Sequence, residues 1–371
     1  MTHLGPSPDD CGMNSRSRKG KRVTRTNQPM ARVLTLNTSD PEFGKLLGRS
    51  FQSGHINFLI GSGGSAPAIP IAGAIESEIA SLFEANDSKA ARRRLYEFLQ
   101  SIHAPTNKLI TECPDAAVTD TSGNYKTYLG IVESILAARR TSLLPKQATI
   151  FCTNYDLFIE HASVAFPALT LNDGFSRVPS LDGRMKYSSR NFFNAIYNTG
   201  NLYSYRVQIP SVNLVKLHGS LSWKREAEDI IFRVAPSAPL DPTCGDAEID
   251  AYLSEHAIVL PQAEKFRTTV LESTYYELLR IYANELDREN TLLVAFGFSF
   301  GDEHIRGITQ RALQNPTLRL MVFAYDQAAR DSFGAIFNGY NNVEIIEPST
   351  GGTINFKEFN EALGSFLPKV T

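Results

Sequence analysis

The chain has only four cysteines among its 371 residues, and no two of them are close enough to form a Cys-x-x-Cys pair. Such pairs supply the ligands of zinc ribbons, so a structural zinc module is not expected. Few, scattered thiols favour a reducing cytoplasm over a secreted fold held by disulfides. No apolar run approaches the roughly 20 residues of a membrane span, and no apolar stretch follows the N-terminal charges as in a secretion signal. We therefore expect a cytoplasmic protein without a membrane partner.

A strong net charge is also lacking, because 37 basic and 39 acidic residues give a formal net charge of -2. No overall field therefore draws the molecule to nucleic acid. The balance is uneven, since residues 1–26 hold six basic residues against two acidic ones. We expect residues 1–30 to form a basic, disordered tail, and contact of this tail with nucleic acid or an acidic partner is the alternative.

The chain as a whole has the composition of a soluble globular protein, with 42% hydrophobic residues. Short apolar runs bounded by Gly, Asn, Asp or Pro predict strands that are covered on both faces. Amphipathic segments between them predict helices, and the alternation favours an α/β fold, a Rossmann-like parallel sheet with helices on both faces. The predicted strands are 56–60, 148–152, 212–217, 291–296, 318–324 and 342–346, and the main predicted helices are 71–85, 89–102, 125–140, 157–165, 273–288, 303–314, 326–336 and 355–366.

The first two predicted strands are separated by far more chain than one crossover helix needs. We interpret residues 72–146 as a helical insertion that forms a smaller domain. The irregular stretch 173–210, rich in Tyr, Phe, Asn and Ser, is expected to contribute to it in part. The Rossmann-like domain then comprises residues 31–71 and 147–371.

A glycine-rich turn, Gly61-Ser62-Gly63-Gly64-Ser65, follows the first predicted strand directly. Glycines there allow a sharp turn and a close approach of the backbone to a pyrophosphate. The next helix, near Ile71, could direct its first amides at phosphate oxygens. A tight turn without a ligand is the alternative. The Gly-Lys-Ser/Thr ending of a P-loop is absent, so this turn is not expected to serve ATP hydrolysis.

Three further polar turns follow predicted strands, and they are Thr153–Asp156, His218–Ser220 and Gly297–His304. Ligands of open parallel sheets bind at the carboxyl ends of the strands, so we expect all these turns to line one crevice.

Each polar residue of these turns also has a purely structural interpretation. Asp156 and Asp302 could be N-caps of the helices that follow them. Asn154 could be a turn residue, and His218 could be a hydrogen-bonded core histidine. For Asp302, a cap and a contact to a sugar hydroxyl are compatible.

The four motifs Gly-Ser-Gly-Gly-Ser, Thr-Asn-x-Asp, Leu-His-Gly and Gly-Phe-Ser-Phe-Gly-Asp occur in an order that resembles the sirtuin-like family, and more narrowly its bacterial anti-phage branch. The resemblance implies an NAD site in the Rossmann-like domain, with Asn154 and His218 as the catalytic pair at the nicotinamide ribose. It implies that the glycine turn holds the pyrophosphate and that Gly297, Ser299 and Asp302 line the adenosine side. The complete set of expected NAD-binding residues is Gly61, Ser62, Gly63, Gly64, Ser65, Ile69, Pro70, Thr153, Asp156, Gly297, Phe298, Ser299, Asp302 and His304.

The residue types suit this chemistry. An Asn amide can orient ribose hydroxyls or an attacking water, and a His with an ordinary pKa of ~6.5 can accept a proton at cellular pH. No metal is needed, and NAD is then a substrate.

Two departures from the protein-deacylating sirtuins change the expected reaction. Their four-cysteine zinc module is missing after the His-Gly motif, where Trp223 begins a segment predicted as a charged loop and a strand at 230–234. Their Asp-Phe-Arg segment is replaced by Ala68–Gly73, of which only the Ile69-Pro70 step resembles the family.

These departures leave water as the simplest acceptor. We therefore expect an NAD hydrolase that releases nicotinamide and ADP-ribose and depletes NAD in anti-phage defence. The alternatives are a protein deacylase, a regulatory subunit that binds NAD or ADP-ribose without turnover, and a nucleic-acid-binding subunit acting through the tail. On the resemblance alone, a homo-oligomer and a HerA-type ATPase partner are expected.

Overall fold

The computed structural model describes residues 30–139, 144–177, 179–199, 206–234, 240, 244–258 and 269–367. The predicted basic tail, apart from Met30, lies outside the described residues. None of the helices within the described ranges is long and apolar enough to cross a membrane.

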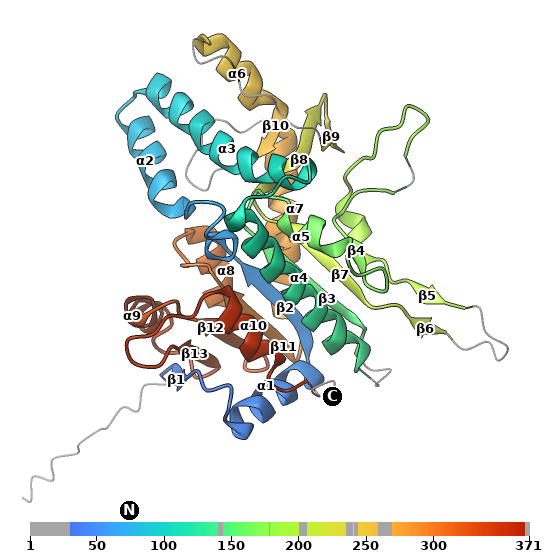
Figure 1. Ribbon diagram of the computed structural model, residues 1–371, viewed down its shortest axis with the longest axis vertical. Helices are drawn as coiled ribbons and strands as arrows, with labels where there is room; N and C mark the ends of the chain where they lie inside the picture. The colour runs from blue at the N-terminus through green and yellow to red at the C-terminus, as the bar shows by residue number, and fades with distance from the viewer. Residues whose placement is uncertain are drawn as a thin grey trace, which may run out of the picture.

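An eight-stranded sheet forms the centre of the molecule (Figure 1), and every neighbouring pair of its strands is parallel. The predicted Rossmann-like α/β fold is therefore confirmed. In spatial order the strands are β1 (Arg32–Thr35), β13 (Val343–Glu347), β12 (Arg319–Phe323), β11 (Thr291–Phe296), β2 (His55–Ile60), β3 (Gln147–Cys152), β7 (Ser211–Lys216) and β4 (Thr170–Asn172).

The direction of strand addition reverses at β2. From β2 the sheet extends through β3 and β7 on one side, and the chain then returns to place β11, β12 and β13 on the other. The β2–β11 boundary is thus the switch point of an open sheet, where ligands bind outside the carboxyl ends of the strands.

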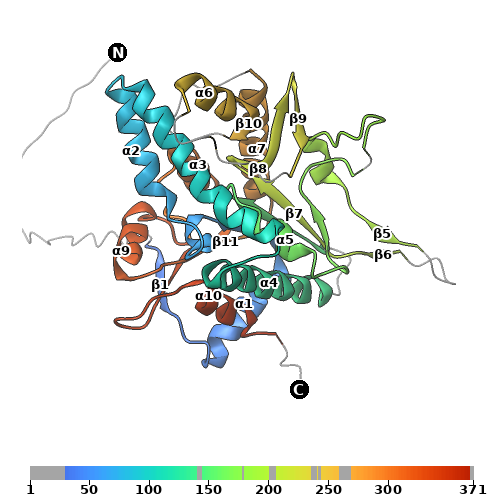
Figure 2. The ribbon, with the colours of Figure 1, turned by 45° about the horizontal axis from the view of Figure 1, so that its top comes forward.

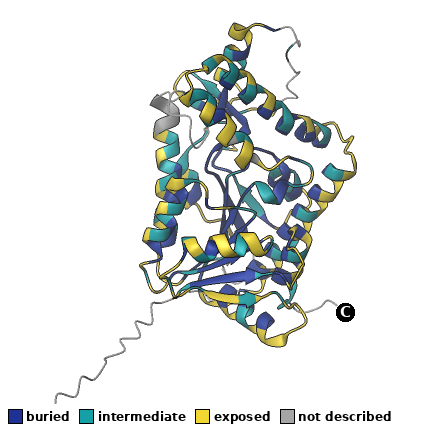
Figure 3. Cartoon of the chain, turned by 90° about the vertical axis from the view of Figure 1, so that its left-hand side faces the viewer, coloured by how far each residue is buried: buried dark blue, intermediate teal, exposed yellow. Residues whose placement is uncertain are grey.

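Hydrophobic clusters cover both faces of the sheet, because successive residues of a strand point to opposite sides. On β2, Phe58 belongs to one of these clusters and Leu59 belongs to the other, on the opposite face of the sheet. Figure 3 shows the buried strands between half-exposed helices. These helices are α1 (Pro41–Ser53), α4 (Ala116–Ala137), α5 (Phe158–Ser163), α7 (Thr269–Asp287), α8 (Glu303–Ala312), α9 (Gln327–Ile336) and α10 (Phe356–Gly364).

The segment predicted as a helical insertion contains α2 (Ala72–Glu84), α3 (Ser88–Ile110) and α4. Helix α4 lies along α10, where Asn360 Nδ2 donates to the carbonyl of Asn124 at 3.0 Å. Helices α2 and α3 extend to the end of the molecule occupied by α6 (Asp246–Glu255), as Figure 2 shows. The salt bridges Lys89–Asp246 and Arg92–Asp250 join α3 to α6. The division into two domains stays a prediction.

The segment after His218 forms a small antiparallel sheet of β10 (His256–Ile258), β8 (Gly219–Glu226) and β9 (Asp229–Phe232). The predicted charged loop after Trp223 is therefore wrong, because β8 continues through Trp223, which is buried. The serines that make this strand look polar are buried and hydrogen-bonded to each other, Ser220 Oγ to Ser222 Oγ at 3.1 Å. The irregular stretch before it contains a 3-10 turn (Ser189–Phe193) and a hairpin of β5 (Tyr197–Asn198) and β6 (Val207–Gln208).

Candidate active site

A cavity of about 1850 Å³ lies at the carboxyl ends of β2, β3, β7 and β11. All of the predicted site residues except Gly61 and Gly64 line it. Residues that were not predicted also line it, among them Phe83 and Asp120 from the α2–α4 segment and Tyr325 and Lys357 from the C-terminal third. The four polar turns therefore converge on one crevice, as expected for turns that follow parallel strands.

The glycines at the end of β2 are required by the close approach of a second turn. Gly63 N donates to the carbonyl of Gly297 at 2.9 Å, so the turns after β2 and β11 pack backbone against backbone. A Cβ on Gly61 would lie 2.4 Å from Gly297 O, and a Cβ on Gly297, which has a φ of +65°, would lie 2.6 Å from Gly64 N. The expected role of this turn in holding pyrophosphate stays a prediction. The turn forms a 3-10 helix at Ser62–Ser65, and residues 66–71 separate it from α2.

Asn154 is buried, and its amide is held in one orientation. Nδ2 donates to the carbonyl of Gly61 at 3.0 Å and to Ser65 Oγ at 2.8 Å. Its Oδ1 is buried and has no hydrogen-bond partner among the described residues. A buried acceptor of this kind is stabilised by a hydrogen-bond donor that a ligand or a water brings. The neighbouring Thr153 N donates to the carbonyl of Ile60 at 3.0 Å, which fixes the turn to the end of β2.

The carboxylate of Asp156 decides how the Asn154 amide is oriented. Ser65 Oγ donates its single proton to Asp156 Oδ2 at 2.6 Å, so Ser65 can only accept from Asn154. The Tyr125 hydroxyl lies 3.1 Å from the same Ser65 oxygen and must therefore donate to it. Burial raises the pKa of Tyr125 well above its ordinary value and keeps this hydroxyl protonated. The second Asp156 oxygen accepts from Phe158 N at 3.1 Å, at the start of α5.

His218 forms a buried pair with Asp302. His218 Nε2 lies 3.1 Å from Asp302 Oδ2, and both side chains are 4% exposed. The other oxygen, Oδ1, accepts from Ile305 N at 3.0 Å, which makes Asp302 the N-cap of α8. Burial opposes ionisation of Asp302, but the interactions with His218, the Ile305 amide and His304 together outweigh it and lower the pKa of Asp302. A carboxylate in this position accepts the Nε2 proton and leaves Nδ1 as the basic nitrogen of His218.

Comparison with known proteins adds a family to this geometry. A family model described as the SIR2-like domain matches residues 148–346, which is more than half of the chain. The chain belongs to the SIR2-like family. Membership indicates a sirtuin-like function that uses NAD, and the match includes Asn154, His218 and Asp302. No curated protein matches the chain.

Within this SIR2-like domain, Asp302 belongs to the turn expected on the adenosine side, but its side chain contacts His218. The remaining residues of that turn, Phe298, Ser299 and His304, line the same cavity. Phe298 packs edge-on against the buried Phe300, with ring centroids 5.0 Å apart. Their contact with adenosine stays a prediction. In the described part of the chain, no group of three or more His, Cys, Asp or Glu is placed to hold a metal ion.

Sequence reasoning missed two polar residues that the SIR2-like site uses. Tyr125 is one of many aromatic residues on helices, and nothing in the sequence distinguishes its hydroxyl. Lys216 had a detectable signal, because it is a charged residue inside an apolar strand and stands two positions before His218. Such a charge is almost never fully buried unless it is paired, so its partners could have been sought.

Proposed function

We propose that this protein hydrolyses NAD at the bond between nicotinamide and ribose and releases ADP-ribose. The observation that carries the proposal is that the Asn154 amide and the His218 imidazole line the same cavity. Asn154 offers an amide oxygen as an acceptor, and His218 offers a ring nitrogen that the hydrogen bond to Asp302 leaves without a proton. Both are buried, so their hydrogen bonds to a substrate are stronger than they would be in water.

The reaction needs little more than these groups. The C–N glycosidic bond breaks and its electron pair leaves with nicotinamide, which changes from a pyridinium cation into a neutral ring. A water oxygen forms the new bond to the ribose carbon and loses one proton. His218 Nδ1 accepts that proton, directly or through a ribose hydroxyl. Asn154 Oδ1 accepts a hydrogen bond from the water or the hydroxyl and fixes its direction.

The test is the release of nicotinamide and ADP-ribose from NAD by the purified protein, with and without its activator or partner. His218→Ala should lower kcat by about 100- to 10,000-fold because it removes the proton acceptor. Asn154→Ala should lower kcat by about 100-fold because the nucleophile is no longer aligned. Asn338→Ala, an exposed position outside the cavity, is the matched control and should keep the wild-type rate.

The outcomes separate the alternatives. Wild-type rates in the folded Asn154 and His218 variants would remove this site assignment. Nicotinamide release that requires an acylated peptide would indicate a deacylase. Binding of NAD in a calorimeter without any product would indicate a regulatory subunit.

We also propose that the activity depletes NAD in defence against phage, and that the protein acts as a homo-oligomer with a HerA-type ATPase. These proposals rest on the four motifs that resemble the anti-phage branch. Cellular NAD should fall during infection of cells that carry the wild-type protein and should stay constant with His218→Ala. Co-purification with a HerA-type ATPase tests the partner, and the mass of the purified assembly tests the oligomer.

A further inference from the structure

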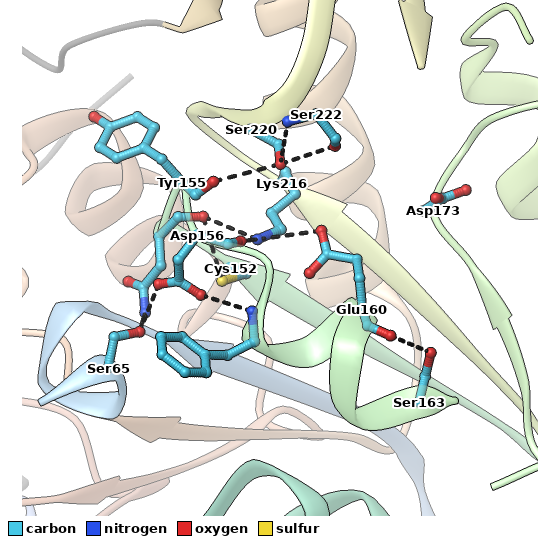
Figure 4. Close-up of polar contacts among 12 residues, drawn as sticks. Ser65, Cys152, Tyr155, Asp156, Glu160, Ser163, Asp173, Lys216, Ser220 and Ser222 are labelled. Carbon is cyan, nitrogen blue, oxygen red and sulfur yellow. Dashed lines mark hydrogen bonds and ion pairs between the residues drawn. The ribbon is translucent and has the colours of Figure 1, made fainter. Parts of the chain in front are cut away.

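The buried lysine at the end of β7 joins the two turns that carry the proposed catalytic pair. Lys216 is 2% exposed, and its Nζ donates to the carbonyl oxygens of Asn154, at 3.1 Å, and of Asp156. It also forms an ion pair with Glu160 Oε1 at 3.4 Å. An ammonium has three protons, and these three acceptors use all of them. Figure 4 shows Lys216 extending towards the turn after β3 that contains Asp156.

The charge of Lys216 is maintained in spite of its burial. Desolvation lowers its pKa, but the carboxylate of Glu160 outweighs this effect together with other nearby groups, and the pKa of Lys216 lies above its ordinary value. Burial in turn raises the pKa of Glu160 to about 7, against the effect of Lys216. A buried ammonium gives little net stability compared with apolar residues of the same size. Its position next to the site therefore needs a reason other than stability.

The turn after β3 is bonded to the segment around His218 at three consecutive carbonyls, those of Asn154, Tyr155 and Asp156. Lys216, before the histidine, holds the carbonyls of Asn154 and Asp156. Leu221 N, after the histidine, donates to the carbonyl of Tyr155 at 2.9 Å, and Ser220 Oγ lies 3.4 Å from the same oxygen. These bonds extend the pairing of β3 with β7 beyond the ends of the two strands and hold the Asn154 turn beside the His218 segment. Among these donors, Lys216 is the one that carries a charge.

We propose that Lys216 is a positioning residue of the NAD hydrolysis proposed above, on which this inference rests. Its ammonium holds the Asn154 turn against the His218 segment, so that the amide and the imidazole face the same substrate atoms. Lys216 itself does not touch the substrate. A misplacement of about 1 Å at a reacting group can lower a rate by about 100-fold, so a lysine that sets this distance affects catalysis without contact.

Three variants separate positioning from charge balance. Lys216→Met removes the donors and leaves the Glu160 carboxylate buried without its cation, which destabilises the fold. The double variant Lys216→Met/Glu160→Gln removes both charges, so its thermal unfolding temperature should recover relative to Lys216→Met. It still lacks the donors to the carbonyls of Asn154 and Asp156. Glu160→Gln alone leaves the ammonium without its carboxylate and should also lower the unfolding temperature, but it keeps the donors to both carbonyls and is the matched control for kcat and exchange.

Two measurements are made on each variant. The first is kcat and KM for NAD hydrolysis. The second is hydrogen–deuterium exchange of peptides spanning residues 153–158, whose Thr153 and Phe158 amides are bonded in the wild type. The double variant should lose about 100-fold in kcat with little change in KM, and its 153–158 amides should exchange faster. Glu160→Gln should resemble the wild type in both measurements.

A wild-type kcat in the double variant would overturn the proposal, and so would an equal loss in Glu160→Gln. Unchanged exchange of the 153–158 amides in the double variant would also overturn it, even if kcat fell, because the turn would then be held without Lys216. Failure of the proposed function looks different. In that case the wild type releases no nicotinamide, and the exchange comparison still decides whether Lys216 holds the turn.

Discussion

Replacing Asp302 by Asn exchanges one oxygen of the proposed site for an NH₂ group and should move the ring proton of His218 from Nε2 to Nδ1. The Asn oxygen must remain at the Oδ1 position, because Ile305 N donates there. The amide nitrogen then faces His218 Nε2, where the carboxylate oxygen Oδ2 lies at 3.1 Å. An NH₂ group donates, so Nε2 has to accept and the ring proton moves to Nδ1. The nitrogen that should take a proton from the substrate is then already protonated.

The size of the effect follows from this change of tautomer. A wrong histidine tautomer lowers kcat by roughly 10,000-fold in serine proteases, where an Asp-to-Asn change has the same consequence. We expect a loss of about 100- to 10,000-fold here, which corresponds to about 3 to 5 kcal/mol in the activation free energy. Stability should change little, because Asn caps a helix about as well as Asp.

Asp302→Ala is the informative partner variant. It removes the cap of α8, which costs about 1 kcal/mol of folding stability, but it leaves His218 free to adopt either tautomer. The two variants should therefore rank in opposite orders, with Asp302→Asn the more stable and Asp302→Ala the more active. Nicotinamide release measured across pH, together with thermal unfolding of both proteins, gives the two rankings. An Asp302→Asn enzyme that is faster than Asp302→Ala would refute the tautomer argument.

Two further changes test the rest of the site. Asp156→Asn should place an NH₂ group against Ser65, so that the Ser65 proton points to Asn154 and the Asn154 amide turns around. We expect kcat to fall by about 10-fold or more. Chemical denaturation should show that the free energy of unfolding falls by about 1.5 to 3 kcal/mol, because the hydrogen bond to the charged carboxylate is lost. Gly297→Ala should destabilise the protein by about 1 to 3 kcal/mol, since its Cβ would meet the backbone of Gly64 at a positive φ, whereas Gly307→Ala in α8, with no atom within 4 Å of the new Cβ, should be neutral or stabilising in the same thermal unfolding experiment.

The part of the fold that the sequence predicted is the part buried on both faces. The six strands predicted for the central sheet are all present, with boundaries that differ by at most one residue, because a continuous apolar run is what a covered parallel strand requires. The strands that were missed are β1 and β4 at the sheet edges, β8 and β10 in the small sheet, and the short pair β5 and β6. The edge strands are short and only partly buried, so their sequences carry no such run.

Helix α4 shows the same limit for helices. It begins at Ala116, nine positions before the predicted start, and its first turns contain Thr, Ser, Gly and Asn, which disfavour helices in isolation. The Asp115 side chain accepts from Val118 N and caps this start, and Val118, Thr121 and Ser122 are buried. Tertiary packing thus stabilises a helix that local propensity does not predict.

The location of the candidate site was predictable, but its internal contacts were not. Turns after parallel strands meet at one edge of a sheet, so the order of motifs along the chain was enough to bring Asn154 and His218 together. The pairing of His218 with Asp302 joins residues 84 positions apart. The hydrogen bonds from Lys216 to the carbonyls of Asn154 and Asp156 depend on where two turns lie after folding. No periodicity or spacing in the sequence encodes either distance.

The contacts of Asp156 and Asp302 bear on the two interpretations that the sequence left open for these residues. For each, a capping role and a site role were the competing interpretations. Asp302 is the N-cap of α8, whereas the N-cap of α5 is Leu157, so the capping interpretation of Asp156 is wrong; even so, each carboxylate uses one oxygen for a backbone amide and the other for the cavity. Asp156 and Asp302 each accept a backbone amide at the start of a helix, from Phe158 and Ile305. The remaining oxygen of each accepts from a side chain of the cavity, Ser65 or His218. Because the backbone amide can only donate, it fixes which oxygen is left for the site and therefore which way the protons of Ser65 and His218 point. The helix starts of α5 and α8 thus determine the hydrogen-bond direction of the proposed catalytic groups. A carboxylate is needed at both positions, because its two oxygens can accept one hydrogen bond from the backbone and one from the site side chain.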